Sequence, residues 1–252
     1  ISKDRSWCDT LLNTIKDYQN EHGKDLIQSK FKIDLELLYN KIDVFSLLFK
    51  WYFFTGLLML IFCIISIFKN HSKFLLHSIK FLKYIILLGW GLHSLGLISR
   101  WIISNHAPWT NGYEAMIYTV WATMLAGIIF SKKSNLTLAT TTCVSSLLLL
   151  FAFVSYLDPT ITNVVPVLNS YWLMIHVSII VASYGFLILG GFLGLLALTL
   201  MIFTNSNNKK IFDLRISELT IINERSLTVG VYMLTIGTFL GGIWANESWG
   251  RY

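Results

Sequence analysis

Trp172 and His176 lie four positions apart in the run YWLMIHVSIIVASYGF. Residues at that spacing share one face of a helix, so the indole and the imidazole would lie one turn apart. At the edge of a membrane, a neutral imidazole beside a tryptophan suits axial ligation of haem iron. An interfacial histidine in an aromatic belt is the alternative interpretation, and these two residues alone leave both open.

Two further histidines have distinctive surroundings. Gly89, His93, Gly96 and Arg100 follow one another at spacings of four, three and four residues, which makes a small and polar stripe on an apolar segment. Ionisable residues deep in a membrane usually face a partner or a pathway, but we favour a hydrogen-bonded packing role for His93. His106 begins the segment HAPWTNGYEAM, in which a proline and an Asn-Gly pair predict an ordered turn.

The chain closes on GGIWANESWGRY, which combines large aromatic rings with polar side chains: Trp244, Asn246, Trp249, Arg251 and Tyr252. Haem is flat, apolar in its ring and anionic at two propionates, so an aromatic shelf beside guanidinium and amide donors suits both parts. We therefore expect Asn246 and Arg251 to form a polar rim. Arg100 is expected to assist from the end of a neighbouring helix.

Membrane helices must position these residues, because the chain is far too apolar for a soluble domain. Its residues are 54% hydrophobic and 13% charged, whereas soluble domains average about 25% charged residues. Runs long enough to cross a bilayer, about 20 residues each, occur at about 44–68, 84–104, 113–131, 136–156, 172–204 and 226–245. The predicted fold is all-α: a polytopic integral membrane helical bundle with about six transmembrane helices and outer-face loops.

The basic residues predict the orientation of this bundle. The net charge of +6 does not indicate nucleic acid as a partner, since most basic residues lie in short loops between apolar runs. Lysines follow the first, third and fifth runs, which places those three loops in the cytoplasm. Loops 105–113 and 157–171 lack Lys and Arg and hold all three prolines, so they face outward, as do residues 1–43 and the closing segment. We expect membrane lipid as a partner. The expected location is a bacterial inner membrane, with the site facing the periplasm.

Depth places His176 on that outer face. Its run of about 33 residues is about 50 Å long as a helix, against a hydrocarbon core of about 30 Å, so one end must protrude. Counting back from the inner end places His176 one to two turns above the outer boundary. Further along the run, Gly190 and Gly194 predict close packing against another helix.

Three stretches together resemble the CcsA (ResC) family of cytochrome c biogenesis. SRWIISNHAPWTNGYEAMIY and WLMIHVSIIVASYGFLILGG are similar to stretches of that family, and GGIWANESWGRY resembles the opening of its Trp-rich WWD segment. ELLYNKIDVFSLLFKWYFFTG resembles the junction of fused CcsBA proteins, in which a CcsB-like half precedes CcsA. The resemblance covers nearly all of residues 35–252.

The resemblance implies a System II cytochrome c synthase, a haem lyase that carries haem b to the outer face and attaches it to the CxxCH thiols of apocytochrome c. It implies that His176 is an axial ligand of the haem iron and that Trp244, Trp249 and Tyr252 begin the platform on which the haem lies. His93 matches no histidine of the family pattern. The second ligand is expected beyond this chain, and a CcsB-like region, fused or separate, is an implied partner. No catalytic side chain is expected, because the peptide supplies both thiols.

The expected organisation has three parts. Residues 1–43 form a helix-containing outer tail of an upstream CcsB-like region, 44–245 the transmembrane CcsA-like domain, and 246–252 the start of a WWD segment. We expect these residues to belong to a longer protein and to be inactive alone. Three alternatives are a haem-handling protein of the CcmC or CcmF type, a permease without haem, and a b-type electron-transfer subunit. A b-type electron-transfer subunit needs two histidines that face each other within the bilayer, and only His93 lies deep enough.

Overall fold

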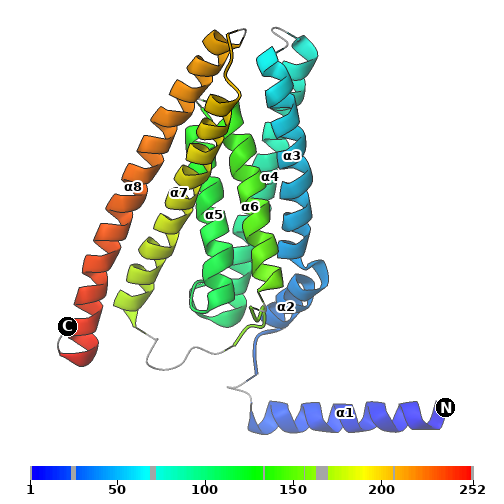
Figure 1. The fold of residues 1–252 in the computed structure, drawn as a ribbon. Coiled ribbons are helices and arrows are strands. Elements are labelled where there is room, and N and C mark those ends of the chain that lie inside the picture. The colour runs from blue at the N-terminus through cyan, green and yellow to red at the C-terminus, as the bar shows by residue number, and fades with distance from the viewer. Residues whose placement is uncertain are drawn as a thin grey trace. The chain divides into compact units, whose positions relative to one another are not determined.

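The computed structural model describes residues 2–23, 27–68, 72–132, 134–155, 157–162, 170–206 and 208–250. Every regular element in these ranges is an α-helix (Figure 1). The helices are α1 (Ser2–His22), α2 (Lys30–Ile42), α3 (Val44–Phe68), α4 (Lys73–Ser104), α5 (Gly112–Phe130), α6 (Asn135–Val154), α7 (Tyr171–Ile202) and α8 (Lys209–Trp249). The chain divides into two compact units, residues 1–41 and 42–252.

The first unit consists of α1 and most of α2. On α1 the exposed apolar side chains Trp7, Leu11, Ile15 and Tyr18 recur at spacings of four, four and three residues, so they lie along one side of the helix. The tail expected from the sequence was a short helix-containing stretch, and this unit is almost wholly helical.

The second unit is a bundle of six helices, α3 to α8, in which α5 and α6 occupy the centre. Helix α6 packs on α3 and α5, α4 packs on α3, and α7 packs on α5 and α8 (Figure 1). Six helical spans in the described residues are long and apolar enough to cross a membrane. The all-α polytopic fold predicted from the sequence is confirmed, and the chain is an integral membrane protein by these spans.

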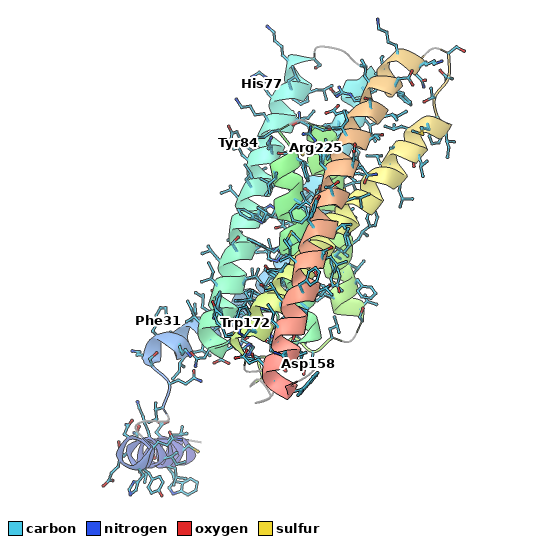
Figure 2. The ribbon with its side chains drawn as sticks, turned by 90° about the vertical axis from the view of Figure 1, so that its left-hand side faces the viewer. Phe31, His77, Tyr84, Asp158, Trp172 and Arg225 are labelled. Carbon is cyan, nitrogen blue, oxygen red and sulfur yellow. The ribbon has the colours of Figure 1, made fainter. Side chains whose placement is uncertain are left out.

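The two ends of the bundle differ in composition. The basic end carries Lys80, Lys83, Lys209 and Arg215, and the proline end carries the loops 105–111 and 157–162. In Figure 2, His77, Tyr84 and Arg225 lie toward the basic end, and Trp172 and Asp158 lie toward the proline end. This separation agrees with the alternation of basic and lysine-free loops along the sequence.

Two helices begin earlier than the hydropathy predicted. The second span was expected from residue 84 and the sixth from residue 226, but α4 begins at Lys73 and α8 at Lys209. Charged residues end an apolar run without ending a helix, because the helix satisfies its own backbone hydrogen bonds in water as well as in lipid. Hydropathy therefore located the part inside the membrane and missed the helical extensions at the basic end.

Helices α7 and α8 form an antiparallel pair whose close contact depends on small residues. Glycines occupy the contact positions. At most of them a side chain would collide with the facing helix, so the two helices can approach closely only because a Cβ is absent. Near the basic end these positions lie on α7, and toward the proline end they lie on α8: Gly190 and Gly194 face Leu227 and Asn223, while Gly230, Gly237 and Gly241 face Leu187, Ile180 and His176. The close packing predicted at Gly190 and Gly194 is present.

Candidate functional site

The His176 ring lies between α7 and α8 near the proline end and is held by one backbone atom of α8. Its Nδ1 lies 2.7 Å from the carbonyl oxygen of Gly237. A carbonyl oxygen only accepts hydrogen bonds, so Nδ1 carries the proton and donates it. In the neutral ring Nε2 is then the atom with the free lone pair, and it makes no hydrogen bond to the described part of the chain. A hydrogen bond on one ring nitrogen that leaves the other open is the usual arrangement of a metal-binding histidine.

Gly241 provides the space for this ring. A Cβ at position 241 would lie 2.5 Å from Cε1, 2.8 Å from Nδ1 and 3.1 Å from Nε2 of His176. Gly241 lies one turn beyond Gly237 on the same face of α8, so one glycine supplies the hydrogen-bond acceptor and the next supplies the clearance. The orientation of the imidazole is therefore set by α8.

Aromatic side chains from both helices lie on the proline-end side of the imidazole. Trp172 is half-buried one turn before His176 on α7, and Trp244 lies three residues after Gly241 on α8. The rings of Trp244 and Trp249 have centroids 5.1 Å apart at an angle of 60°. The Nε1 atom of Trp244 is buried and has no hydrogen-bond partner among the described residues. An unpaired buried N–H is costly, so this donor is suited to a ligand that brings an acceptor.

The remaining predicted residues of the closing segment are only partly described. Asn246 is exposed near the end of α8, and Gly250 ends the helix in the left-handed conformation, at φ 67°. Residues 246–249 thus continue α8 without a break. Arg251 and Tyr252 lie outside the described residues, so the polar rim and the platform proposed for them stay predictions.

Arg100 lies in a different setting from the one expected. Its side chain is fully buried, and its Nε donates to Oε1 of Glu114 at 2.8 Å. Its Nη1 donates to the carbonyl oxygen of Pro159 at 2.8 Å and its Nη2 to that of Thr160 at 3.0 Å. The guanidinium also lies 5.3 Å from the centre of the Tyr113 ring. A haem propionate would have to compete with these partners, so we place Arg100 outside the candidate site.

Glu114, which its sequence context did not mark as a functional residue, organises the loop that precedes α5. Asn111 caps the helix by accepting the backbone N–H of Glu114 at 2.8 Å, and the carboxylate accepts the backbone N–H of Thr110 at 2.9 Å. His106 joins this loop to residues 160–162, since its Nε2 lies 3.1 Å from the carbonyl oxygen of Thr162. The proline end is thus held together by a buried ion pair and its hydrogen bonds.

His93 is a packing residue. Its side chain is fully buried, with Nε2 3.0 Å from the carbonyl oxygen of Ile117, so Nε2 carries the proton. Its Nδ1 lies 3.4 Å from the hydroxyl of Tyr52, which can donate to it. Both ring nitrogens are therefore engaged, and neither is available to iron. This geometry agrees with the packing interpretation and removes the residue that a b-type electron-transfer subunit would need.

Two site residues, Gly237 and Gly241, were missed by reasoning from the sequence. Both lie in TIGTFLGGIWANESW, where the spacing of four residues between them matches that of Gly190 and Gly194, for which close packing was predicted. That spacing was the available signal for close packing. It could not identify His176 as the facing side chain, because that depends on how α7 and α8 align.

Comparison with known proteins gives consistent matches. The family model described as "Cytochrome C assembly protein" matches residues 109–252. The chain is 43% identical to "Protein NrfI" of Wolinella succinogenes over 244 residues, which are 96% of this chain and 26% of NrfI. It is 31% identical to "Cytochrome c biogenesis protein CcsA" of Prochlorococcus marinus subsp. pastoris over 229 residues, 79% of this chain and 72% of that protein. A protein of the same name from Guillardia theta is 31% identical over 203 residues, 69% of this chain and 67% of that protein. The chain thus spans about a quarter of NrfI.

Proposed function

Since this chain belongs to the cytochrome c assembly protein family, we propose that it holds haem at the proline end of its bundle for attachment to apocytochrome c. The observation that carries the proposal is the hydrogen bond from Nδ1 of His176 to the Gly237 carbonyl, which leaves Nε2 open to bind iron. The names of the CcsA relatives refer to cytochrome c biogenesis, which is the process that the resemblance implied.

The residues around His176 fit haem in three respects. The neutral Nε2 is a suitable axial ligand, the indoles of Trp172, Trp244 and Trp249 offer flat apolar surfaces, and the unpaired N–H of Trp244 offers a donor for an anionic oxygen. Asn246, Arg251 and Tyr252 extend the proposed platform along the chain. Haem b is the form we propose, because its vinyl groups are intact and can react with thiols.

The proposed reaction needs positioning and no catalytic side chain of this chain. A thiol of the CxxCH peptide adds to a haem vinyl group: sulfur bonds to one vinyl carbon, and the thiol hydrogen ends on the other, so no oxidant is consumed. His176 and the tryptophans would fix the haem with its vinyl edge open to the peptide, and such positioning lowers the entropic part of the barrier. The activity is that of a haem lyase.

We propose that the complete protein is larger and includes the second ligand. The NrfI match covers 96% of this chain and only 26% of NrfI, and this difference in length supports a complete protein that is larger. We assign residues 1–43 to an upstream CcsB-like region. Under this proposal the proline end faces the periplasm across a bacterial inner membrane, and haem reaches it from the cytoplasmic side. The isolated 252 residues would lack the second ligand and be inactive.

The decisive experiment replaces His176 with alanine in the complete protein. We expect loss of most of the Soret absorbance of the purified protein and of covalent haem on a co-expressed cytochrome c. His77→Ala is the matched control, because His77 is exposed at the basic end and lies near no part of the site (Figure 2). If H176A retains wild-type absorbance and maturation, the ligand assignment is wrong. If the wild-type protein has no Soret band at all, a permease without haem becomes the better interpretation.

A further inference from the structure

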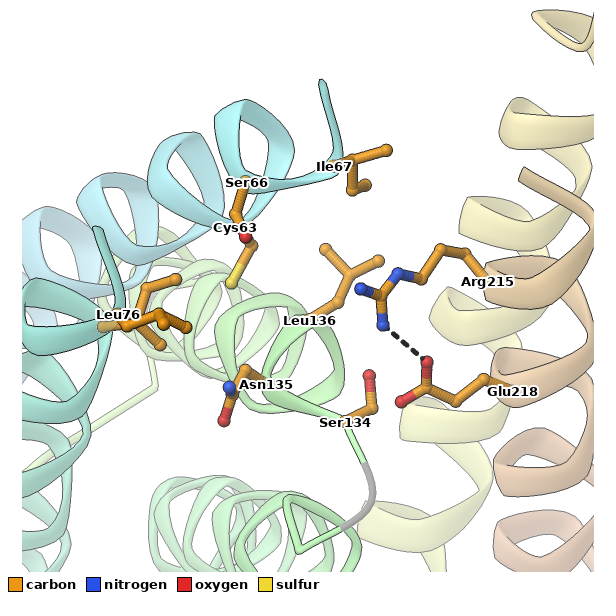
Figure 3. Close-up of a pocket in the computed structure, with 10 residues that line it drawn as sticks. Cys63, Ser66, Ile67, Leu76, Ser134, Asn135, Leu136, Arg215 and Glu218 are labelled. Carbon is orange, nitrogen blue, oxygen red and sulfur yellow. Dashed lines mark hydrogen bonds and ion pairs between the residues drawn. The ribbon is translucent and has the colours of Figure 1, made fainter. Parts of the chain in front are cut away.

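A groove at the basic end combines positive charge with an apolar floor. It has a volume of about 350 Å³ and is lined by seven residues, six of them from α4: Leu76, Ile79, Lys80, Lys83, Tyr84, Leu87 and Asn135. A smaller cavity of about 180 Å³ adjoins it and shares Leu76, Ile79 and Asn135 (Figure 3). Neither cavity contains a residue of the proposed haem site.

The charge in the groove is unbalanced. Lys80 and Lys83 lie three residues apart on one face of α4, and the lining contains no acidic side chain. Neither lysine forms an ion pair within the described part of the chain. In the adjoining cavity, by contrast, Nη1 of Arg215 lies 2.9 Å from Oε2 of Glu218, so that charge is compensated (Figure 3). The groove therefore attracts an anion, and the adjoining cavity does not.

The order of side chains along α4 matches an amphipathic anion at a membrane surface. Lys80 is exposed, Lys83 is half-buried, and Tyr84 is 57% exposed beside them. One turn deeper, the lining is Leu87, next to the exposed side chain of Leu88. This order matches a phospholipid at a membrane surface. Its charged headgroup would lie beside the lysines and the tyrosine, and its acyl chains would lie beside the leucines further in.

We propose that this groove binds the phosphate of an anionic phospholipid in the leaflet at the basic end. The ammonium groups of Lys80 and Lys83 donate to the phosphate oxygens, and Tyr84 and Asn135 border the headgroup. The acyl chains run along Leu87 toward the bilayer centre. A zwitterionic lipid would add a cationic group close to the two lysines, so the groove selects phosphatidylglycerol over phosphatidylcholine.

The test uses the complete protein in detergent micelles, titrated with phosphatidylglycerol or phosphatidylcholine and analysed by native mass spectrometry. We expect phosphatidylglycerol to bind more tightly, and Lys80→Gln with Lys83→Gln to weaken its binding about 25-fold, at about fivefold per lysine. The control variant Lys73→Gln with Lys132→Gln removes two exposed charges at the same end, outside the groove, and should change binding less than about twofold. Lys80→Arg with Lys83→Arg should retain binding.

Several outcomes would overturn the proposal. Equal binding of the two lipids by the wild-type protein would do so without any variant, and so would equal losses in the glutamine variant and its control. Displacement of the lipid by millimolar inorganic phosphate would show that the groove binds the free anion. Displacement by hemin at equal concentration would show that a porphyrin carboxylate is the ligand. Lipid binding is compared only between samples with the same circular dichroism signal, so that a folding defect is not mistaken for a loss of binding.

Discussion

Nδ1 of His176 lies 2.7 Å from the carbonyl oxygen of Gly237, sixty-one residues away in the sequence. This hydrogen bond determines which imidazole nitrogen carries the proton, and its acceptor belongs to the backbone of another helix. It also requires Gly241, since any side chain there would displace the ring.

Gly241→Ala should weaken haem binding by the complete protein without unfolding it. The new methyl group would come within 3 Å of two ring atoms of His176, so the ring must turn and lose its bond to Gly237. Loss of such a supporting hydrogen bond typically costs about 10- to 100-fold in metal affinity. Soret absorbance during a hemin titration measures the change. Gly191→Ala is the control, because a Cβ at Gly191 meets no atom within 4 Å. Equal affinities in the two variants would contradict the role of Gly241.

Arg100→Ala should destabilise the bundle strongly. It leaves the carboxylate of Glu114 buried and unpaired, and breaking a buried ion pair in this way costs about 3–5 kcal/mol. Arg215→Ala breaks an ion pair whose arginine is 43% exposed and should cost about 0–1 kcal/mol. Thermal unfolding in detergent compares the two variants, and R100L/E114L should recover much of the loss.

The same variants separate a structural role of Arg100 from a propionate contact. If Arg100 only holds the loops, R100L/E114L should bind haem with wild-type affinity once it is folded. Loss of haem affinity in that folded double variant would restore the expectation that Arg100 contacts the propionates.

His93→Ala should lower stability and leave the haem spectrum unchanged. The substitution empties a buried volume and removes the partners of the Ile117 carbonyl and the Tyr52 hydroxyl. Such losses amount to about 2–5 kcal/mol. The measurement is thermal unfolding together with the Soret band per mole of folded protein. A shifted or weakened band in H93A, with stability intact, would show that His93 ligates iron.

The loop at residues 158–160 should loosen in acid. The backbone N–H of Thr160 donates to Oδ1 of Asp158 at 2.9 Å, and this hydrogen bond holds the pKa of the Asp158 carboxyl below its ordinary value. A lowered pKa in the folded state stabilises the loop above the ordinary carboxyl pKa of about 3.9, and the effect is lost as the pH falls through the folded pKa. Hydrogen exchange of the Thr160 amide, corrected for its intrinsic rate, should accelerate below about pH 4 in the wild type. Asp158→Ala should exchange faster already at neutral pH, and an unchanged rate there would refute this account.

Much of the fold followed from hydropathy, since six apolar runs became six membrane helices. The starts of α4 and α8 did not follow, because Lys83 and Arg225 mark where the apolar runs begin, whereas the helices themselves begin at Lys73 and Lys209. The contacts of His93 with the Ile117 carbonyl and the Tyr52 hydroxyl agree with the packing role predicted from its depth and its small neighbours. The surroundings of Arg100 did not follow, because its partner Glu114 lies fourteen residues away, across a loop whose path brings Pro159 and Thr160 to the same point. Such pairings depend on loop geometry that no periodicity encodes.

The antiparallel packing of α7 on α8 has a mechanical consequence for the ring of His176. Gly237 presents its carbonyl to His176 only while the two helices keep their present alignment along their axes. A helix advances about 1.5 Å per residue and turns by about 100°, so a shift of α8 by one residue of register, with both movements, would carry that carbonyl away from the ring. Such a screw motion of α8 would release the imidazole from its orientation with no change in any residue. The orientation of the His176 ring is thus coupled to the longitudinal position of α8, which among the described helices packs most extensively on α7.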